Sequence, residues 1–313
     1  MTQTPVYPLD LNFLGRKGTI AAYLVPCAGG AMLVESGPGS TLESLQANLA
    51  NHGLTLRDIS HVLLTHIHLD HAGAAGHLAR MGAQIFVHPV GAAHMLDPEK
   101  LLNSAQRIYG EKMKYMWGEF LPVPPEKLTE VQDGETVAAG NLRFTALHTP
   151  GHAEHHIAWL FEDKCFSGDA GGVRLPGPLY IRMPFVPPEL HLEKWRASLT
   201  WLQNAGFKQI VPTHFGIFDD ADSHLAAARR ILDETERWLE AIMPADPPIE
   251  ELRARFMDLQ KEQARSFGLS EAIIESYRVG AAYEIANPTR MGADGLQRYW
   301  RKVRMAAYPA ARA

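Results

Sequence analysis

Residues 61–71 read HVLLTHIHLDH, an apolar run that ends in a cluster of ionisable side chains. His66 and His68 alternate along an extended backbone, so we expect both side chains on one side of it. Asp70 and His71 follow where the chain turns into a helix. Three imidazoles and one carboxylate form a ligand set suited to Zn²⁺, Fe or Mn, and burying them without a cation would be costly. The stretch therefore predicts a metal site at the end of a strand.

The segments on both sides of this stretch predict an α/β fold. Residues 19–36 read as two apolar strands around the Gly29–Gly30 turn, residues 71–83 as a short helix and residues 83–89 as a strand. Further strands are expected at 128–137, 142–150, 156–161, 164–169 and 208–214, with helices at 97–120 and 190–202. Clusters of strands separated by isolated helices favour two sheets that are covered by helices on their outer faces.

Three more potential metal ligands each follow a predicted strand and lie beside a glycine or another turn residue. They are His152 after strand 142–148, Asp169 after strand 164–167, and His214 after strand 208–211. Because one loop cannot complete the coordination of two metal ions, these residues are the natural candidates for the missing ligands. The repetition of the same local context is stronger evidence than any one of the three residues alone.

The pattern of the sequence changes after about residue 219, where helical spacing dominates to the end. The helical stretches are 223–243, 249–267, 269–287 and 295–303. We therefore expect two parts, residues 1–219 with the metal site and residues 220–313 as a C-terminal helical region.

Composition narrows the class of partner. The formal net charge is −5 and there is no long run of one sign, so binding to nucleic acid or to a membrane surface is not expected. Cys27 and Cys165 form no CxxC motif and are expected to be reduced thiols. The N-terminus lacks a signal-peptide pattern, and no window approaches the roughly 18 apolar residues of a transmembrane helix. The expectation is a cytoplasmic protein that acts on a small molecule.

The motifs THIHLDH, HTPGH, SGD and PTH together resemble the metallo-β-lactamase superfamily, in the branch with an HxHxDH motif. The resemblance covers roughly residues 7–218 and implies an αββα sandwich with two divalent metal ions at one edge, most simply Zn²⁺, with Fe or Mn as alternatives. Residues 1–219 would then be the catalytic domain. The implied ligands are His66, His68 and His152 for one ion, Asp70, His71 and His214 for the other, and Asp169 as a bridge.

The chemistry that this resemblance implies is metal-dependent hydrolysis. Two metal ions would activate a bridging hydroxide, which attacks an ester, thioester, lactone or phosphoester, and Asp70 would be catalytic as well as a ligand. Hydroxyacylglutathione hydrolases share both the two-metal site and a C-terminal helical appendage, so the chain resembles them in particular. No GxSxG motif supplies a serine nucleophile, and Cys165 is expected in the core.

The sequence is also compatible with two other functions. A mononuclear iron dioxygenase of the persulfide type uses the same fold, and its three ligands would match His66, His152 and Asp169. The complete second set of ligands favours the dinuclear hydrolase instead. A binding module without enzymatic activity is the third possibility, against which the intact ligand set argues.

Substrate contacts are expected from two segments, residues 97–120 and 170–188. We expect a hydrophobic lid with one or two arginines, formed by Trp117, Arg174, Tyr180 and Arg182. The C-terminal helices would complete a substrate wall or a homodimer interface. Three further histidines flank His152, and one of them is expected to orient a ligand; they are His148, His155 and His156.

Overall fold

A computed structural model describes residues 3–276 and 282–307 of the chain. Its first sheet has six strands in the order β1-β2-β3-β4-β5-β6. Their bounds are β1 Tyr7–Asp10, β2 Ala21–Cys27, β3 Gly30–Val34, β4 Ile59–Leu63, β5 Gln84–Val87 and β6 Leu128–Glu130. The predicted hairpin at 19–36 is confirmed, since β2 and β3 pair antiparallel up to Cys27 and Gly30. Gly29 makes this tight turn possible because its φ of 84° lies in the left-handed region.

The second sheet has five strands in the order β11-β10-β9-β8-β7. Their bounds are β7 Thr136–Ala139, β8 Leu142–His148, β9 Ile157–Phe161, β10 Lys164–Phe166 and β11 Gln209–Val211. The strand expected over 128–137 is two strands in different sheets, because the chain crosses from β6 to β7 through a turn at Gly134, which has a φ of 75°. The single helix expected over 97–120 is likewise interrupted, at Gly110 with a φ of 55°.

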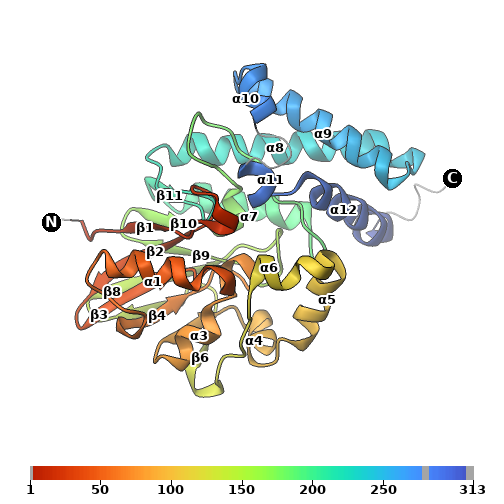
Figure 1. The fold of residues 1–313 in the computed structure, drawn as a ribbon. Coiled ribbons are helices and arrows are strands. Elements are labelled where there is room, and N and C mark those ends of the chain that lie inside the picture. The colour runs from red at the N-terminus through yellow and green to blue at the C-terminus, as the bar shows by residue number, and fades with distance from the viewer. Residues whose placement is uncertain (1–2, 277–281, 308–313) are drawn as a thin grey trace.

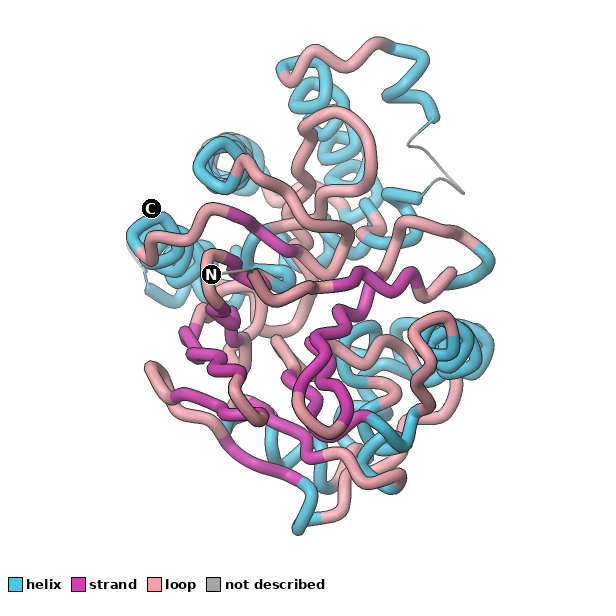
Figure 2. Tube along the Cα trace, turned by 90° about the vertical axis from the view of Figure 1, so that its left-hand side faces the viewer, coloured by secondary structure: helices cyan, strands magenta, loops and turns pink. Residues whose placement is uncertain are grey.

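Helices cover the outer face of each sheet (Figures 1 and 2). Beside the first sheet lie α1 Leu42–Ala50, α2 Leu69–Ala72, α3 Ala75–Arg80, α4 Pro89–Leu96, α5 Glu99–Tyr109 and α6 Met113–Trp117. On the side of the second sheet lie α7 Leu192–Asn204 and α8 Ala221–Ile242. The remaining C-terminal helices are α9 Ile249–Ser266 and α10 Glu271–Ser276, which lie beyond α8, and α11 Ala282–Ala286, α12 Thr289–Tyr299 and α13 Met305–Ala307. Part of the helix expected over 269–287 lies outside the described residues. Among those residues, no helix is both long and apolar enough to cross a membrane.

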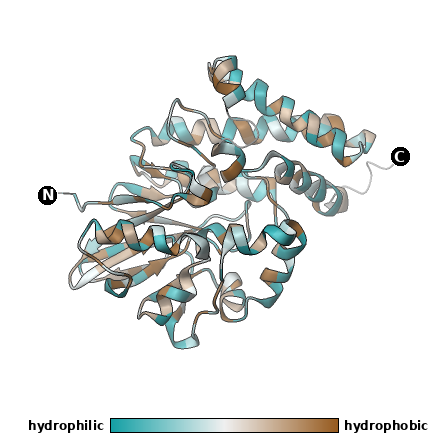
Figure 3. Cartoon of the chain, in the orientation of Figure 1, coloured by the Kyte–Doolittle hydropathy of each residue, from teal (hydrophilic) through white to brown (hydrophobic). Residues whose placement is uncertain are grey.

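Each sheet packs a different core on each of its two faces, because side chains alternate along its strands. Figure 3 shows hydrophobic (brown) segments along the strands of both sheets. On β2, Tyr23 and Val25 point into the space between the sheets, where they meet Phe144 and Trp159 of the second sheet. Leu24 and its alternate neighbours point to the opposite face, toward α1 and α3. A third core joins the second sheet to α7, α8, α9 and α12. The predicted αββα sandwich with a C-terminal helical region is confirmed, and the helical region shares its core with the second sheet.

Strand direction brings the carboxyl ends of six strands to one edge of the sandwich. These strands are β3, β4 and β5 of the first sheet and β8, β10 and β11 of the second. In the first sheet, β3, β4 and β5 run parallel, so their carboxyl ends lie on the same side. In the second sheet, β10 is parallel to β11, and β8 is parallel to β10 because each is antiparallel to β9. The predicted ligands follow β4, β8, β10 and β11. The topology therefore gathers them at a shared edge.

Candidate metal centre

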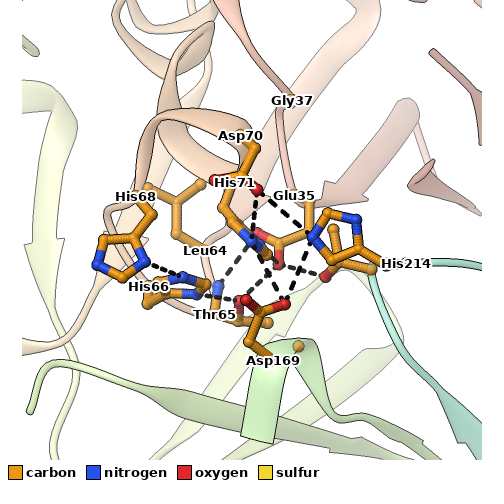
Figure 4. A network of polar contacts seen from close by, with 12 residues as sticks. Glu35, Gly37, Leu64, Thr65, His66, His68, Asp70, His71, Asp169 and His214 are labelled. Atoms are coloured by element: carbon orange, nitrogen blue, oxygen red, sulfur yellow. Dashed lines mark hydrogen bonds and ion pairs between the residues drawn. The ribbon is translucent and has the colours of Figure 1, made fainter. Parts of the chain in front are cut away.

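Three imidazoles meet at one side of the centre, and Figure 4 shows two of them, His66 and His68. His66 and His68 come from the loop that leaves β4, and His152 comes from the turn after β8. His68 Nδ1 lies 3.0 Å from His66 Nε2 and also 3.0 Å from His152 Nε2. The three nitrogen atoms are thus close enough together to bind one cation.

A second group contains a carboxylate and two imidazoles. Asp70 and His71 lie in α2, and His214 follows β11. Asp70 Oδ2 lies 3.6 Å from His71 Nε2 and 3.4 Å from His214 Nε2. Ligand atoms about 2.1 Å from a tetrahedral cation lie about 3.4 Å from one another, so this spacing also suits one cation.

Asp169 lies between the two groups and turns a different oxygen toward each. Its Oδ2 is 3.3 Å from His152 Nε2 in the first group. Its Oδ1 is 3.6 Å from His71 Nε2 and 3.5 Å from His214 Nε2 in the second. The structure therefore brings together all seven residues that the sequence indicated as ligands, with one carboxylate shared between two sets of three.

Hydrogen bonds at the far side of the rings fix which nitrogen faces the centre. His71 Nδ1 donates to Glu35, His152 Nδ1 to the carbonyl of Pro184, and His214 Nδ1 to the carbonyl of Thr19. Carboxylate and carbonyl oxygens only accept, so each of these rings carries its hydrogen on Nδ1 when neutral. Their Nε2 lone pairs are then directed at the centre, which is the arrangement that a metal requires.

The two groups differ in charge. Burial lowers the pKa of His66 well below its usual range, and burial lowers that of His68 to about 4. Burial also lowers the pKa of His71, but nearby carboxylates, Asp70 foremost, outweigh it and raise the value to about 10. Burial raises the pKa of Asp169. The first group is thus a set of neutral imidazoles, and the second is an acidic set that favours positive charge.

Several atoms at the centre lack hydrogen-bond partners among the described residues. His71 Nε2, His214 Nε2 and Asp169 Oδ1 are buried and unsatisfied. Leaving three polar atoms unpaired at one point costs free energy unless something else binds them. The raised pKa of His71 keeps a proton on its ring when no cation is bound, and a metal ion would displace that proton. Two imidazole nitrogens and one carboxylate oxygen are the ligand atoms that a divalent cation takes, so the residues present fit a metal ion.

Glu35 supports the centre through hydrogen bonds, although no sequence pattern indicated it. It directly follows β3 and is completely buried. Its carboxylate accepts hydrogen bonds from Thr65 Oγ1 at 2.5 Å, Thr213 Oγ1 at 2.8 Å and His71 Nδ1 at 2.8 Å. An acidic residue soon after a buried strand is the same signal that indicated Asp169, but Glu35 lies outside the motifs that marked the metal site.

The three histidines around His152 have different surroundings. His148 donates to the carbonyl of Val131, and the ring of His155 stands beside those of His66 and His68. His156 Nε2 accepts the backbone N–H groups of Asp169 and Ala170, at 3.2 and 3.3 Å. It therefore holds the turn that carries the shared carboxylate.

We expect His156→Leu to lower the affinity for divalent metal by about 10- to 100-fold, the usual effect of losing a group that orients a ligand. The change leaves two buried N–H groups unpaired, so the Asp169 turn can shift. Competition with a chromophoric chelator measures the affinity. His148→Leu is the control, because it removes a half-buried histidine nearby that does not contact the Asp169 turn, whereas His156 is fully buried. Equal affinity in both variants would contradict this role for His156.

A cavity of about 210 Å³ opens above the centre. Its lining includes His68, Asp70, His152 and Asp169 of the candidate centre, and Trp117.

The other three expected substrate contacts do not line this cavity. Arg174 forms a two-pronged ion pair with Asp220 at the start of α8. Arg182 pairs with Glu284 at 2.7 Å and also donates to Tyr180, whose ring is buried. These three side chains therefore join the 170–188 loop to the C-terminal helices, through distant partners that no local sequence pattern indicates.

Residues 15–214 match the sequence family described as the Metallo-beta-lactamase superfamily. A metallo-beta-lactamase fold-containing protein of Sulfurisphaera tokodaii is 29% identical over 148 residues, which cover 46% of this chain and 56% of that protein. An atrochrysone carboxyl ACP thioesterase of Aspergillus fumigatus is 29% identical over 202 residues, 63% of this chain and 51% of the relative. The chain thus spans about half the length of these relatives.

Solved structures share the fold at low sequence identity. A metallo-beta-lactamase family protein of Thermus thermophilus superimposes with a TM-score of 0.63 at 22% identity, covering 95% of this chain and 93% of that one. A metallo-beta-lactamase bound to 2-mercaptoethanesulfonate gives a TM-score of 0.54 at 21% identity and covers 74% and 92% of the two chains. The first of these similarities extends through the C-terminal helical region.

Proposed function

This chain belongs to the metallo-β-lactamase superfamily, and from that premise we propose that it is a hydrolase that uses two divalent metal ions. The observation that carries the proposal is the position of Asp169, whose two oxygens face two separate groups of three ligands. A site for one metal would not need a carboxylate directed both ways. The same geometry makes a mononuclear iron dioxygenase, with His66, His152 and Asp169 as ligands, the less favoured alternative.

In this proposal His66, His68 and His152 hold one ion, Asp70, His71 and His214 hold the other, and Asp169 is shared. Two bound cations would supply a hydroxide nucleophile at neutral pH and positive charge for the developing oxyanion. Asp70 also lines the cavity. Burial raises the pKa of Asp70, but His71 and His214 outweigh it and hold the value below its usual range, so we assign this ionised carboxylate the task of orienting the attacking water by accepting a hydrogen bond from it. Cys165 is buried in the core and burial raises the pKa of its thiol, which suits a structural role.

We favour an ester or thioester as the substrate. Among the described residues that line the cavity, Lys100 is the only lysine or arginine. Two metal ions could hold one phosphoryl group by themselves, but a substrate with further phosphates needs more cationic side chains. One exposed lysine therefore supports a neutral carbonyl substrate better. The similarity to a fungal protein described as a thioesterase supports the same choice.

Metal analysis combined with a substrate panel tests the proposal. We expect about two divalent ions per chain and hydrolysis of at least one ester, thioester, lactone or phosphodiester. One iron per chain with consumption of oxygen would support the dioxygenase instead. If His68→Ala lowers neither metal content nor any activity, the fold serves as a binding module.

Chelation should abolish the activity and loosen the fold. Ligand binding at a thousand times its dissociation constant stabilises a protein by about 4 kcal/mol, so we expect removal of the metal to lower Tm by about 10 °C. Activity and Tm should both return on addition of Zn²⁺. Calorimetry and a hydrolysis assay on the same samples give the measurement. Unchanged Tm and activity after complete chelation, verified by elemental analysis, would exclude metal-dependent hydrolysis.

A further inference from the structure

The cavity has an apolar interior and a polar mouth. Phe13, Ala105 and Trp117 line it and are at least nine-tenths buried. The polar lining residues away from the metal centre include Lys100, Ser104 and Glu189, which are exposed. A substrate that enters this space would therefore bury an apolar part inside and leave a polar part at the mouth.

The wall is built from two segments far apart in the sequence. One segment is α5 with α6. The other runs from α11, which contributes Ile285, into α12, which contributes Met291. Figure 1 shows these segments, yellow and dark blue, on the same side of the molecule. They meet where the Tyr109 hydroxyl lies 3.9 Å from the Met291 sulfur.

Aromatic rings make the α5–α6 side of the wall continuous. The ring of Trp117 stacks on Phe13, with centroids 5.2 Å apart, and meets Tyr109 edge-on at 5.1 Å. Burial raises the pKa of the Tyr109 hydroxyl, so this group stays neutral. The α5–α6 side of the cavity thus offers an apolar, uncharged surface next to the candidate metal centre.

We propose that this cavity binds the apolar acyl group of an ester or thioester whose polar leaving group stays at the mouth. The inference rests on the proposed function and names its substrate class. A space of about 210 Å³ has room for several non-hydrogen atoms of a substrate, and we infer that an unbranched acyl chain of about six carbons fills it. Acetyl esters leave most of the apolar wall uncovered.

The test is a series of thioesters with one thiol, N-acetylcysteamine, and acyl chains of two to twelve carbons. Each added methylene should raise kcat/KM by about threefold to fourfold, which corresponds to about 0.8 kcal/mol per buried CH₂. The rise should stop near six carbons, where the cavity is full. A companion series of acetyl esters with alcohols of increasing length should show a much weaker dependence.

A pair of alanine variants locates the effect in the cavity. Ala105 lines the cavity on α5, while Ala93 is exposed on α4 and outside it. Ala105→Leu should lower the ratio of hexanoyl to acetyl kcat/KM by about tenfold, because the added methylenes occupy the space of the acyl chain. Ala93→Leu should leave that ratio unchanged. Ile285→Ala, which enlarges the cavity without crowding it, should move the optimum to a longer chain.

The outcomes separate this inference from the proposed function. Equal kcat/KM for acetyl and hexanoyl thioesters would overturn the inference and leave the hydrolase intact. A dependence on alcohol length instead of acyl length would reverse the assigned orientation and also overturn it. If no thioester is hydrolysed, titration calorimetry measures how tightly hexanoate and acetate bind and thereby tests the apolar cavity alone. Tighter binding of hexanoate, lost in Ala105→Leu, supports the apolar cavity, and equal binding rejects it.

Discussion

Replacing Asp169 by asparagine is expected to lower kcat/KM by at least about a thousandfold, because charge stabilisation by metal is worth several kcal/mol and each 1.36 kcal/mol is tenfold. Its two oxygens face His152 on one side and His71 with His214 on the other. An amide keeps the shape but has one oxygen and no charge, so neither ion would keep this ligand unchanged. Elemental analysis should show loss of metal in parallel with activity.

The protein should still fold after this change. Burial raises the pKa of Asp169, which means that the buried negative charge is unfavourable in the metal-free protein, and asparagine removes that charge. Thermal melting of metal-free samples tests that point, and we expect Tm of the variant to match or exceed that of the unaltered protein. Asp258→Asn is the control, as Asp258 is an exposed residue of α9 that forms an ion pair with Lys261 on the same helix. Two ions per chain and normal turnover in Asp169→Asn would refute the shared-ligand assignment.

Replacing Glu35 by alanine should destabilise the protein by about 3–5 kcal/mol, which is typical when one partner of a buried charged network is removed. Thr65, Thr213 and His71 would lose the acceptor that all three share. Tm should fall by about 10 °C, and metal affinity by about 10- to 100-fold because His71 would no longer be held in one orientation. Denaturant unfolding with and without chelator separates the two effects.

Glu162 provides a matched control for Glu35. Both residues have a left-handed backbone, with φ of 70° at Glu35 and 52° at Glu162, but Glu162 is exposed and its carboxylate accepts hydrogen bonds from Thr4. Glu162→Ala therefore reproduces the backbone effect without the buried network and should cost less than about 1 kcal/mol. Similar losses in the two variants would mean that backbone strain, and not the hydrogen bonds, explains the result at Glu35.

The ligand positions could be predicted because short-range signals mark them. Each follows an apolar strand, and parallel strands place their carboxyl ends at one edge whatever the loops do. The roles of the residues around them are harder to predict from sequence. Arg174 is held by an ion pair with Asp220, 46 residues away, and Arg182 by one with Glu284, 102 residues away. No local pattern indicates such partners. Glu35 was missed for a related reason, as its role depends on hydrogen bonds to residues of both sheets.

The hydrogen bonds of Glu35 also bear on when the centre can form. They join it to Thr65, 30 residues away, and to Thr213, 178 residues away. Closing so long a loop is slow, and it requires both sheets to be nearly in place. During synthesis the centre cannot be complete before residue 214 has left the ribosome. We therefore expect metal binding to be a late step of folding. The ion would stabilise a tertiary structure that has already formed and would not nucleate it.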